Sequence, residues 1–445
     1  MNPLLIVLIG VAVVVGGILW LRLHAFLSLM AGAMVVAMLS PGSSSVGERI
    51  ADGFGDEAKK VGILIAMAAV LGKTLMDSGA AERIVLSLRR TLGEGQVALA
   101  YLISGFVMAA LVLSDTTFYL LIPLARVTSA RTGRNYLLYI LAIVAGAVMT
   151  HSLVPPAAGP VFVAAQLHVK VATMMLGGTI VGGIASTAGF VYALWANRRW
   201  QIPMRNALGV SATELERIAN RDESMLPPLW LSLLPIALPV VLITLGDEIS
   251  QPVIKALGNP NVALSLAAAI GLAMMWWRKE GTTRPQFTAA VAQALASAGV
   301  MVLIISAGGA FGWVVQQTGI AQVLRNDLPT SRLAILPLAF LITSAVRTAQ
   351  GSAIVSMSTA IAVVGPLAAA GSLGFHPVYL ALAIGCGSKA IPWMNDAGFW
   401  IIGQTSGMTE SETLKTVSVM MTIMGVVGLG ATVLGAWLFP LVAAH

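Results

Sequence analysis

The sequence predicts an all-α polytopic membrane protein with two inverted repeats, and three observations carry this prediction. The 445 residues are 57% hydrophobic and only 10% charged, whereas soluble domains carry roughly a quarter charged residues. Two long apolar stretches are each interrupted twice by polar, glycine or proline residues. The order of the elements is the same in both halves of the chain, which indicates a divergent internal repeat.

Apolar runs of about 20 residues, the length that crosses a bilayer, predict membrane helices along the whole chain. They cover residues 3–21, 25–40, 61–78, 172–195, 229–246, 259–277, 287–316 and 417–440. The first run has no positive n-region and no small-residue cleavage site, so we interpret it as a retained helix. The polar stretch 40–60 is expected to lie outside the membrane helices.

The remaining apolar stretches, 96–166 and 333–407, carry the interruptions. These are Ser114–Thr117, His151–Pro160, Arg347–Ser352 and Lys389–Asp396. Pro155 and Pro156 lack a backbone N–H, so a helix must break there. Broken backbone at membrane depth is tolerated only where it is buried in protein or lines a cavity. Such interruptions are the best indication in a sequence of a substrate site.

Charge placement favours re-entrant hairpins at residues 96–130 and 333–370 over full spans. With the first hairpin in place, the basic residues around it share the cytoplasmic side, as the positive-inside rule requires. They are Arg83, Arg89, Arg90, Arg126, Arg131, Arg134, Arg198, Arg199 and Arg205. An odd number of crossings then separates the repeats, so they are inverted. Both chain termini are expected on the outer side of a bacterial cytoplasmic (inner) membrane.

These elements divide the chain into five parts. The predicted parts are scaffold helices at 1–60, a first repeat at 61–195, a cytoplasmic linker at 196–228, further scaffold helices at 229–286 and a second repeat at 287–445. The broken helices are expected at 135–166 and 376–407. Short amphipathic helices are predicted at 80–92 and 319–328, and the linker is expected to hold a short helix at 212–220 whose N-terminus carries a capping box.

Composition excludes several classes of function. The single cysteine, Cys386, rules out an intramolecular disulfide and a cysteine-based metal site, and no metal or cofactor is predicted. The sequence pI is about 9.8, but the basic residues are dispersed between apolar segments, which indicates membrane topology rather than nucleic-acid binding. The motif Gly53–Asp56 matches the GxGD pattern of intramembrane aspartyl proteases. The second aspartate that such enzymes need is missing, so no enzyme is predicted.

The four interruptions are expected to converge near the membrane midplane, where exposed helix N-termini favour anions. Ionisable residues at that depth are costly and functional by default. Around the interruptions lie the cationic groups Arg347, Lys389 and His151 and the carboxylates Asp115 and Asp396. Neutral donors and acceptors come from Thr116, Thr117, Thr150, Ser152, Thr348, Gln350, Ser352 and Asn395. This set predicts a small anionic, hydroxyl-rich ligand.

Several of these residues keep two interpretations. Asp115 is either a proton or hydroxyl acceptor or the N-cap of a helix facing a cytoplasmic vestibule. Arg347 either binds a carboxylate or extends to the outer surface. His151 either caps a half-helix or takes part in proton transfer, since its unperturbed pKa is about 6.5. Asp396 and Lys389 either neutralise one another or contact the ligand.

Around these interruptions the sequence resembles the gluconate permease (GntP) family, a branch of the ion transporter superfamily. Thr150–Pro160 is similar to the family's T-H-G-F-L-P-P-H-P-G-P, and Asn395–Trp400 is similar to N-D-P-G-F-W. Arg347–Ser352 resembles R-I-A-L-G-S, and Gly308–Phe311 resembles G-G-A-F. Two departures line the expected pocket. Leu113–Phe118 stands in place of F-Y-E-V-G-F, and Ala157-Ala158 replaces a histidine and a proline.

The resemblance implies proton-coupled uptake of gluconate or a related hydroxy acid by a homodimer with a scaffold domain and a mobile transport domain. In that interpretation Arg347 binds the carboxylate. Hydroxyls are held by Asn395, Thr116, Thr150 and Ser152, and the candidates for proton coupling are Asp115, His151 and Asp396. A sodium-coupled carboxylate carrier is the alternative within transport, and a channel or a membrane sensor is the alternative outside it.

Overall fold

The computed structural model describes residues 2–21, 23–40, 45–110, 114–205, 223–249, 251–277, 283–319, 332–370, 373–393 and 396–441. These residues form helices and turns, with no strand among them, which confirms the all-α prediction. Five described segments are long and apolar enough to cross a membrane: Tyr136–Gln166, Val171–Arg199, Leu229–Gly246, Arg284–Gln317 and Glu410–Leu438.

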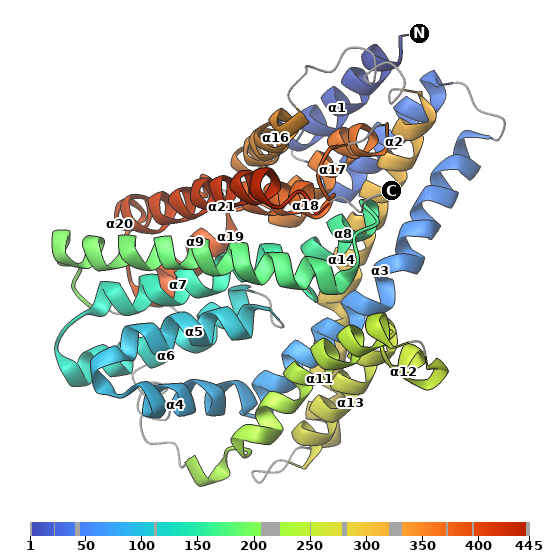
Figure 1. Ribbon diagram of the computed structural model, residues 1–445. Coiled ribbons are helices and arrows are strands. Elements are labelled where there is room, and N and C mark those ends of the chain that lie inside the picture. The colour runs from blue at the N-terminus through green and yellow to red at the C-terminus, as the bar shows by residue number, and fades with distance from the viewer. Residues whose placement is uncertain are drawn as a thin grey trace.

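One layer of the protein, the long-helix layer, runs along the right of Figure 1. Its helices are α1 (Pro3–Leu19), α2 (Ala25–Leu39), α3 (Val46–Asp77), α11 (Leu229–Glu248), α12 (Pro252–Leu257), α13 (Pro260–Trp276) and α14 (Arg284–Gln317). The centre of this layer is the pair α3 and α14, which pack side by side, with α13 against α3 and α2 against α14.

A second layer, the interrupted-helix layer, carries the breaks that the sequence predicts. In the first half of the chain it contains α5 (Val97–Ala109), α6 (Ser114–Thr132), α7 (Tyr136–Leu153), α8 (Ala158–Gln166) and α9 (Val171–Arg199). In the second half it contains α16 (Ile335–Gln350), α17 (Ala353–Ala370), α18 (Val378–Gly387), α19 (Ala397–Ser406) and α21 (Val419–Leu438). Shorter elements are α4 (Ala80–Leu92), α20 (Glu410–Thr413), three 3-10 turns at Glu94–Gln96, Glu223–Met225 and Arg332–Ala334, and a π-helical turn, Leu414–Ser418.

Helices in the same order make the same kinds of contact in both halves. In the first half α7 packs between α5 and α9, and in the second half α18 packs between α16 and α21. The halves also exchange contacts, because α19 packs on α6 and α8 packs on α17. This exchange brings the ends of all four interrupted elements to one place.

The polar stretch before residue 61 differs from the expectation. Helix α3 begins at Val46 and continues through this stretch, and its N-terminus is closed by a capping box between Ser45 and Glu48. Polar residues recur there at helical spacing, as in the pair Lys60–Asp56 at 2.6 Å, and the helix buries one polar face against its neighbours. The predicted helix at 212–220 and nearly all of the one at 319–328 lie outside the described residues.

The polar residues of the interruptions also sit differently from the expectation. Ser114–Thr117 forms the first turn of α6, and Arg347–Gln350 forms the last turn of α16. Thr150–Leu153 likewise ends α7 before the break. The breaks themselves are therefore short. Most of their polar side chains belong to the first or last turns of helices.

The packing of α5 against α7 depends on glycine. A Cβ at Gly146 would lie 2.0 Å from the backbone oxygen of Leu102, and one at Gly105 would lie 2.7 Å from that of Ile143. Small residues of this kind let membrane helices approach closely.

We expect Gly146→Ala to push α5 away from α7 and to destabilise the folded protein by about 1–3 kcal/mol, the usual effect of overpacking. Gly183→Ala is the matched control, since a Cβ at Gly183 in α9 meets nothing within 4 Å. Thermal unfolding in detergent measures both variants. Equal melting temperatures for the two would show that α5 and α7 can separate at little cost.

Candidate substrate site

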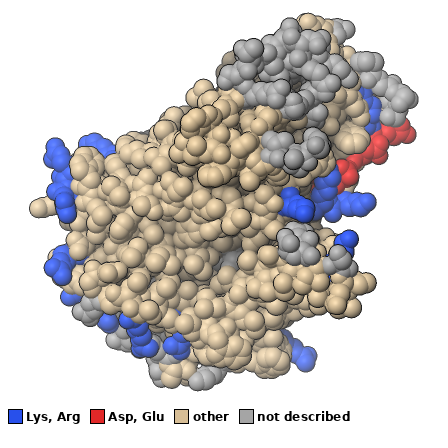
Figure 2. Space-filling view, in the orientation of Figure 1, with Lys and Arg blue, Asp and Glu red and all other residues tan. Residues whose placement is uncertain are grey.

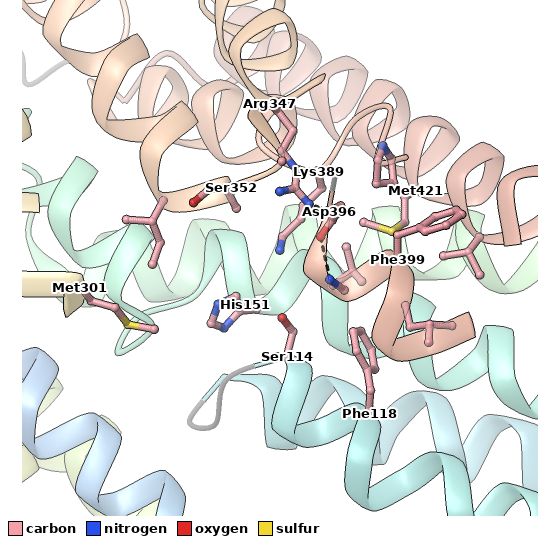
Figure 3. Close-up of a pocket in the computed structure, with 18 residues that line it drawn as sticks. Ser114, Phe118, His151, Met301, Arg347, Ser352, Lys389, Asp396, Phe399 and Met421 are labelled. Atoms are coloured by element: carbon pink, nitrogen blue, oxygen red, sulfur yellow. Dashed lines mark hydrogen bonds and ion pairs between the residues drawn. The ribbon is translucent and has the colours of Figure 1, made fainter. Parts of the chain in front are cut away.

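The ends of α6, α7, α16, α17, α18 and α19 surround a cavity of about 220 Å³ in the interrupted-helix layer. Its polar or charged lining consists of Ser114, His151, Arg347, Ser352, Lys389 and Asp396. Figure 3 shows Arg347, Lys389 and Ser352 entering from one side and His151 and Ser114 from the opposite side. Phe118, Phe399 and Met421 close the cavity with apolar surface, and Met301 reaches it from α14.

Local sequence directs three helix N-termini at this cavity. Gly351 adopts the left-handed conformation (φ 84°) and ends α16. The next residue, Ser352, accepts a hydrogen bond from the backbone N–H of Val355 in the first turn of α17 (3.4 Å). Asp396 caps α19 by accepting from the N–H of Gly398 at 2.8 Å. With Ser114 at the start of α6, these N-termini place positive dipole ends around the space.

Arg347 and Asp396 form a buried ion pair at the wall of the cavity. Their side chains are 4% and 8% exposed, and the guanidinium Nη2 donates to Oδ2 of Asp396. The sequence-based alternatives for Asp396 and Lys389, mutual neutralisation or ligand contact, stay predictions, and the ion pair that the structure adds joins Asp396 to Arg347. The reason is the packing of α16 beside α18, which brings the last turn of α16 against the N-terminus of α19.

Two further cationic or basic groups face the same space. The Lys389 side chain is buried and lines the cavity, and in Figure 3 its amine points into the space between Arg347 and His151. Nδ1 of His151 is buried and has no hydrogen-bond partner in the described structure. The described lining thus holds a guanidinium, a lysine amine and one carboxylate, a set of groups that can bind a small organic anion.

Four of the predicted site residues lie outside the lining. Thr117, Thr150 and Ser152 are completely buried. Thr150 donates to the backbone oxygen of Gly146 (3.0 Å), and Ser152 is hydrogen-bonded to Ser388, with 3.1 Å between the hydroxyl oxygens. Thr348 donates to the oxygen of Ser344 (2.8 Å), and its own carbonyl accepts from the Trp393 indole (2.5 Å).

Other predicted residues cannot be placed in the cavity. Asn395 lies outside the described residues. The backbones of Asp115 and Thr116 are part of α6 and that of Gln350 is part of α16, but their side chains lie outside the described structure. The contributions of these residues stay predictions.

The lining also contains residues that the sequence did not single out. Ser114 belongs to a predicted interruption, but the ionisable side chain there is that of its neighbour Asp115. Met301 lies in the middle of an apolar helix, so nothing in its sequence neighbourhood distinguishes it from lipid-facing residues. Phe118 follows the Ser114–Thr117 interruption and Phe399 follows the Lys389–Asp396 interruption. Only the packing of α6 against α19 shows that both aromatic side chains line the same cavity.

The far end of α19 is held by a second buried arginine. Nη1 of Arg126 in α6 donates to the backbone oxygen of Ser406 (2.9 Å), and Nη2 donates to that of Arg205 (2.6 Å). The Tyr136 hydroxyl donates to the same Ser406 oxygen. Nearby, Arg205 forms an exposed bidentate pair with Glu412 (2.6 and 2.9 Å). These bonds connect the first half of the chain to the broken helix of the second half.

Comparison with known proteins assigns the family. The GntP family permease model matches residues 2–438. The chain belongs to the GntP permease family. A gluconate permease of Pseudomonas aeruginosa is 31% identical over 422 residues, which is 92% of each chain. A gluconate permease of Zymomonas mobilis subsp. mobilis is 30% identical over 425 residues, again 92% of each chain. An L-idonate transporter of Escherichia coli K12 is 28% identical and covers 96% of this chain and 97% of its own.

The fold of this GntP permease also has a solved counterpart. The YdaH transporter of Alcanivorax borkumensis superposes with a TM-score of 0.62 over 99% of both chains at 13% sequence identity. The two proteins therefore share a fold. The family and its relatives are permeases and not enzymes, so the predicted family and the prediction of a multi-pass membrane transporter are confirmed.

Proposed function

We propose that this GntP permease is a secondary transporter that couples proton entry to uptake of a small organic anion, such as gluconate or a related hydroxy acid. The observation that carries this proposal is the cavity lined by a guanidinium, a lysine amine, one carboxylate and three helix N-termini. The names of the relatives, which include gluconate and L-idonate carriers, support a sugar acid as the guest.

In this proposal the substrate carboxylate binds between Arg347 and Lys389. A guanidinium has five N–H donors, so Arg347 can hold a substrate carboxylate while it stays paired with Asp396. Hydroxyl groups of the substrate bind Ser114, Ser352 and the predicted Thr116, Gln350 and Asn395. The aromatic rings of the lining cover the carbon chain.

Proton coupling is proposed for Asp115, His151 and Asp396. His151 supports this role because it lines the cavity and its buried Nδ1 has no hydrogen-bond partner in the described structure, so it can receive a proton or a substrate hydrogen bond. Asp396 supports it because its carboxylate is shared between Arg347 and the α19 N-terminus. A substrate anion that competes with Asp396 for Arg347 makes the ionised form of Asp396 less stable.

The conformational change is proposed as movement of the interrupted-helix layer against a dimeric scaffold formed by the long-helix layer, with α5–α6 and α16–α17 as re-entrant hairpins of inverted repeats. The repeated contacts of the two halves support this arrangement. Basic side chains gather on the left edge in Figure 2, over the ends of α9 and α6. The positive-inside rule assigns that edge to the cytoplasm of a bacterial inner membrane, with both termini on the other side.

Uptake into proteoliposomes tests the proposed function. Labelled gluconate and L-idonate are offered under an inward proton gradient, an inward sodium gradient, or neither. We expect accumulation under the proton gradient alone. A sodium requirement without proton dependence contradicts the coupling, and absence of counterflow exchange across a panel of hydroxy acids contradicts a carrier of this class in favour of a channel or a sensor.

The buried hydroxyls distinguish structural residues from substrate ligands. We expect Ser152→Ala to leave gluconate affinity nearly unchanged and to reduce stability by about 1 kcal/mol, the usual effect of losing one neutral hydrogen bond. Ser352→Ala, which removes a hydroxyl from the cavity lining, is expected to weaken binding several-fold. Isothermal titration on both variants measures this. If both lose affinity equally, Ser152 contacts the substrate in another conformation.

A further inference from the structure

Glu57 is a buried carboxyl group outside the substrate cavity. Its side chain is 1% exposed and lies on the face of α3 that packs against α14. A Cβ added to Gly309 of α14 would lie 2.6 Å from both Cβ and Cγ of Glu57, so this glycine makes room for the acid. Oε2 of Glu57 accepts a hydrogen bond from the side-chain amide of Gln166 at the end of α8.

The charge of Glu57 is poorly compensated. Lys60 lies 3.7 Å from Oε2 and makes its closer ion pair, 2.6 Å, with Asp56, which is partly exposed. The neighbouring helices supply no charge that compensates Glu57. Helices α2, α8, α13 and α17 contain no titratable residue, and the one titratable residue of α14 is Arg284, at the start of that helix. The charged residues of α4 lie against the other end of α3, roughly 30 Å along the helix. His168 and Lys170, which follow α8, form no ion pair with Glu57 in the described structure.

The hydrogen bonding of Glu57 is also incomplete. Its Oε1 is buried and accepts no hydrogen bond from any described residue. An ionised carboxylate with an unsatisfied oxygen in such surroundings is costly. Lys60 and Gln166 are therefore the described groups that favour the ionised form. The hydrogen bond from Gln166 also joins the two layers of the protein, since α3 belongs to the long-helix layer and α8 to the interrupted-helix layer.

We propose that Glu57 is a proton-binding site outside the substrate cavity, which takes up a proton as α8 separates from α3. The proposal rests on the proposed function and specifies part of its coupling. When α8 moves, the carboxylate loses the Gln166 donor, and a proton from the adjacent aqueous phase binds Glu57 to form a neutral carboxylic acid. When α8 returns, the proton leaves to water and the charge-assisted hydrogen bond re-forms. By linkage, protons then favour the separated arrangement to the same extent.

Infrared difference spectroscopy tests this on the full-length protein in lipid nanodiscs, without substrate. A pH titration between about pH 5 and 9 follows the carbonyl stretch of protonated carboxylic acids. We expect a titrating band in the wild type that is absent in Glu57→Gln. In Gln166→Leu the band is expected to persist to higher pH, because the ionised form has lost its donor. Asp52→Asn, which neutralises an exposed carboxylate of the same helix, is the control and is expected to keep the band.

The outcomes are distinct from those of the transport test, which needs a substrate. A wild-type spectrum with no band assigned to Glu57, or one that Gln166→Leu leaves unchanged, overturns the proposal even if proton-driven uptake is observed. Should Glu57→Gln fail to fold, the comparison of wild type with Gln166→Leu still decides. In the uptake assay, Glu57→Gln is expected to flatten the pH dependence of transport, and an unaltered pH profile contradicts the proposal.

Discussion

Arg347→Ala is expected to reduce uptake of the anion by at least about 100-fold. The guanidinium is 4% exposed, lines the cavity and is paired with Asp396. Its removal would delete the proposed charge-assisted contact to the substrate, and each such hydrogen bond contributes about 1.5–3 kcal/mol. Substrate binding and uptake are measured on the same purified variant.

The same substitution also affects folding, because Asp396 is left buried without this partner. Breaking a buried ion pair in this way costs about 3–5 kcal/mol. The double variant Arg347→Ala with Asp396→Asn separates the two effects, since the neutral amide removes the uncompensated charge. We expect the double variant to recover most of the melting temperature and none of the binding. If binding returns as well, the carboxylate site lies at Lys389 instead.

Lys73→Ala is the matched control for a lost cation. Lys73 lies in α3, is 30% exposed and pairs with Asp77 at 3.0 Å. Partly exposed pairs of this kind contribute little, so uptake is expected to stay near the wild-type rate.

Arg126→Ala is expected to have a large effect as well, although Arg126 lies away from the cavity. It donates to the carbonyls of Ser406 and Arg205 in a buried setting, and the loss of both bonds is expected to destabilise the fold by on the order of 3 kcal/mol. A cation at the C-terminus of α19 also complements the helix dipole. Since α19 is only 10 residues long, a displacement of its C-terminus is expected to displace Asp396 at its N-cap as well.

The measured quantities are the melting temperature and the initial rate of uptake, which is expected to fall at least about tenfold because helix geometry transmits the displacement to the cavity. Arg205→Ala is the control from the same cluster, since its bidentate pair with Glu412 is exposed and exposed pairs contribute little. Equal losses in the two variants would show that Arg126 does not position α19.

Much of the fold follows from the sequence because each membrane helix must by itself be apolar over the thickness of the bilayer. The run from Leu229, for example, is apolar over a bilayer-spanning length, and α11 forms there. Pro155 and Pro156 exclude a continuous helix, and α7 ends two residues before them. The polar half of α3 was not predicted, because its residues are stabilised by the face of α14 rather than by a lipid environment.

The candidate site was predictable only in part. His151 and Ser152 are neighbours in sequence, yet His151 lines the cavity and Ser152 is hydrogen-bonded to Ser388. Successive residues of an α-helix point in directions about 100° apart, and the rotation of α7 about its axis depends on its neighbours. Motifs therefore identify the helix end but not the side chain that faces the substrate.

The sequence by itself determined the all-helical membrane class, the positions of the breaks and the family, because bilayer length, proline geometry and short motifs act locally along the chain. Only the tertiary structure decided which groups meet. The pairs Arg347–Asp396, Arg126–Ser406 and Gln166–Glu57 join segments that are 49, 280 and 109 residues apart. A buried polar group is satisfied by whichever partner the packing of helices brings within hydrogen-bond distance, and no local pattern contains that information.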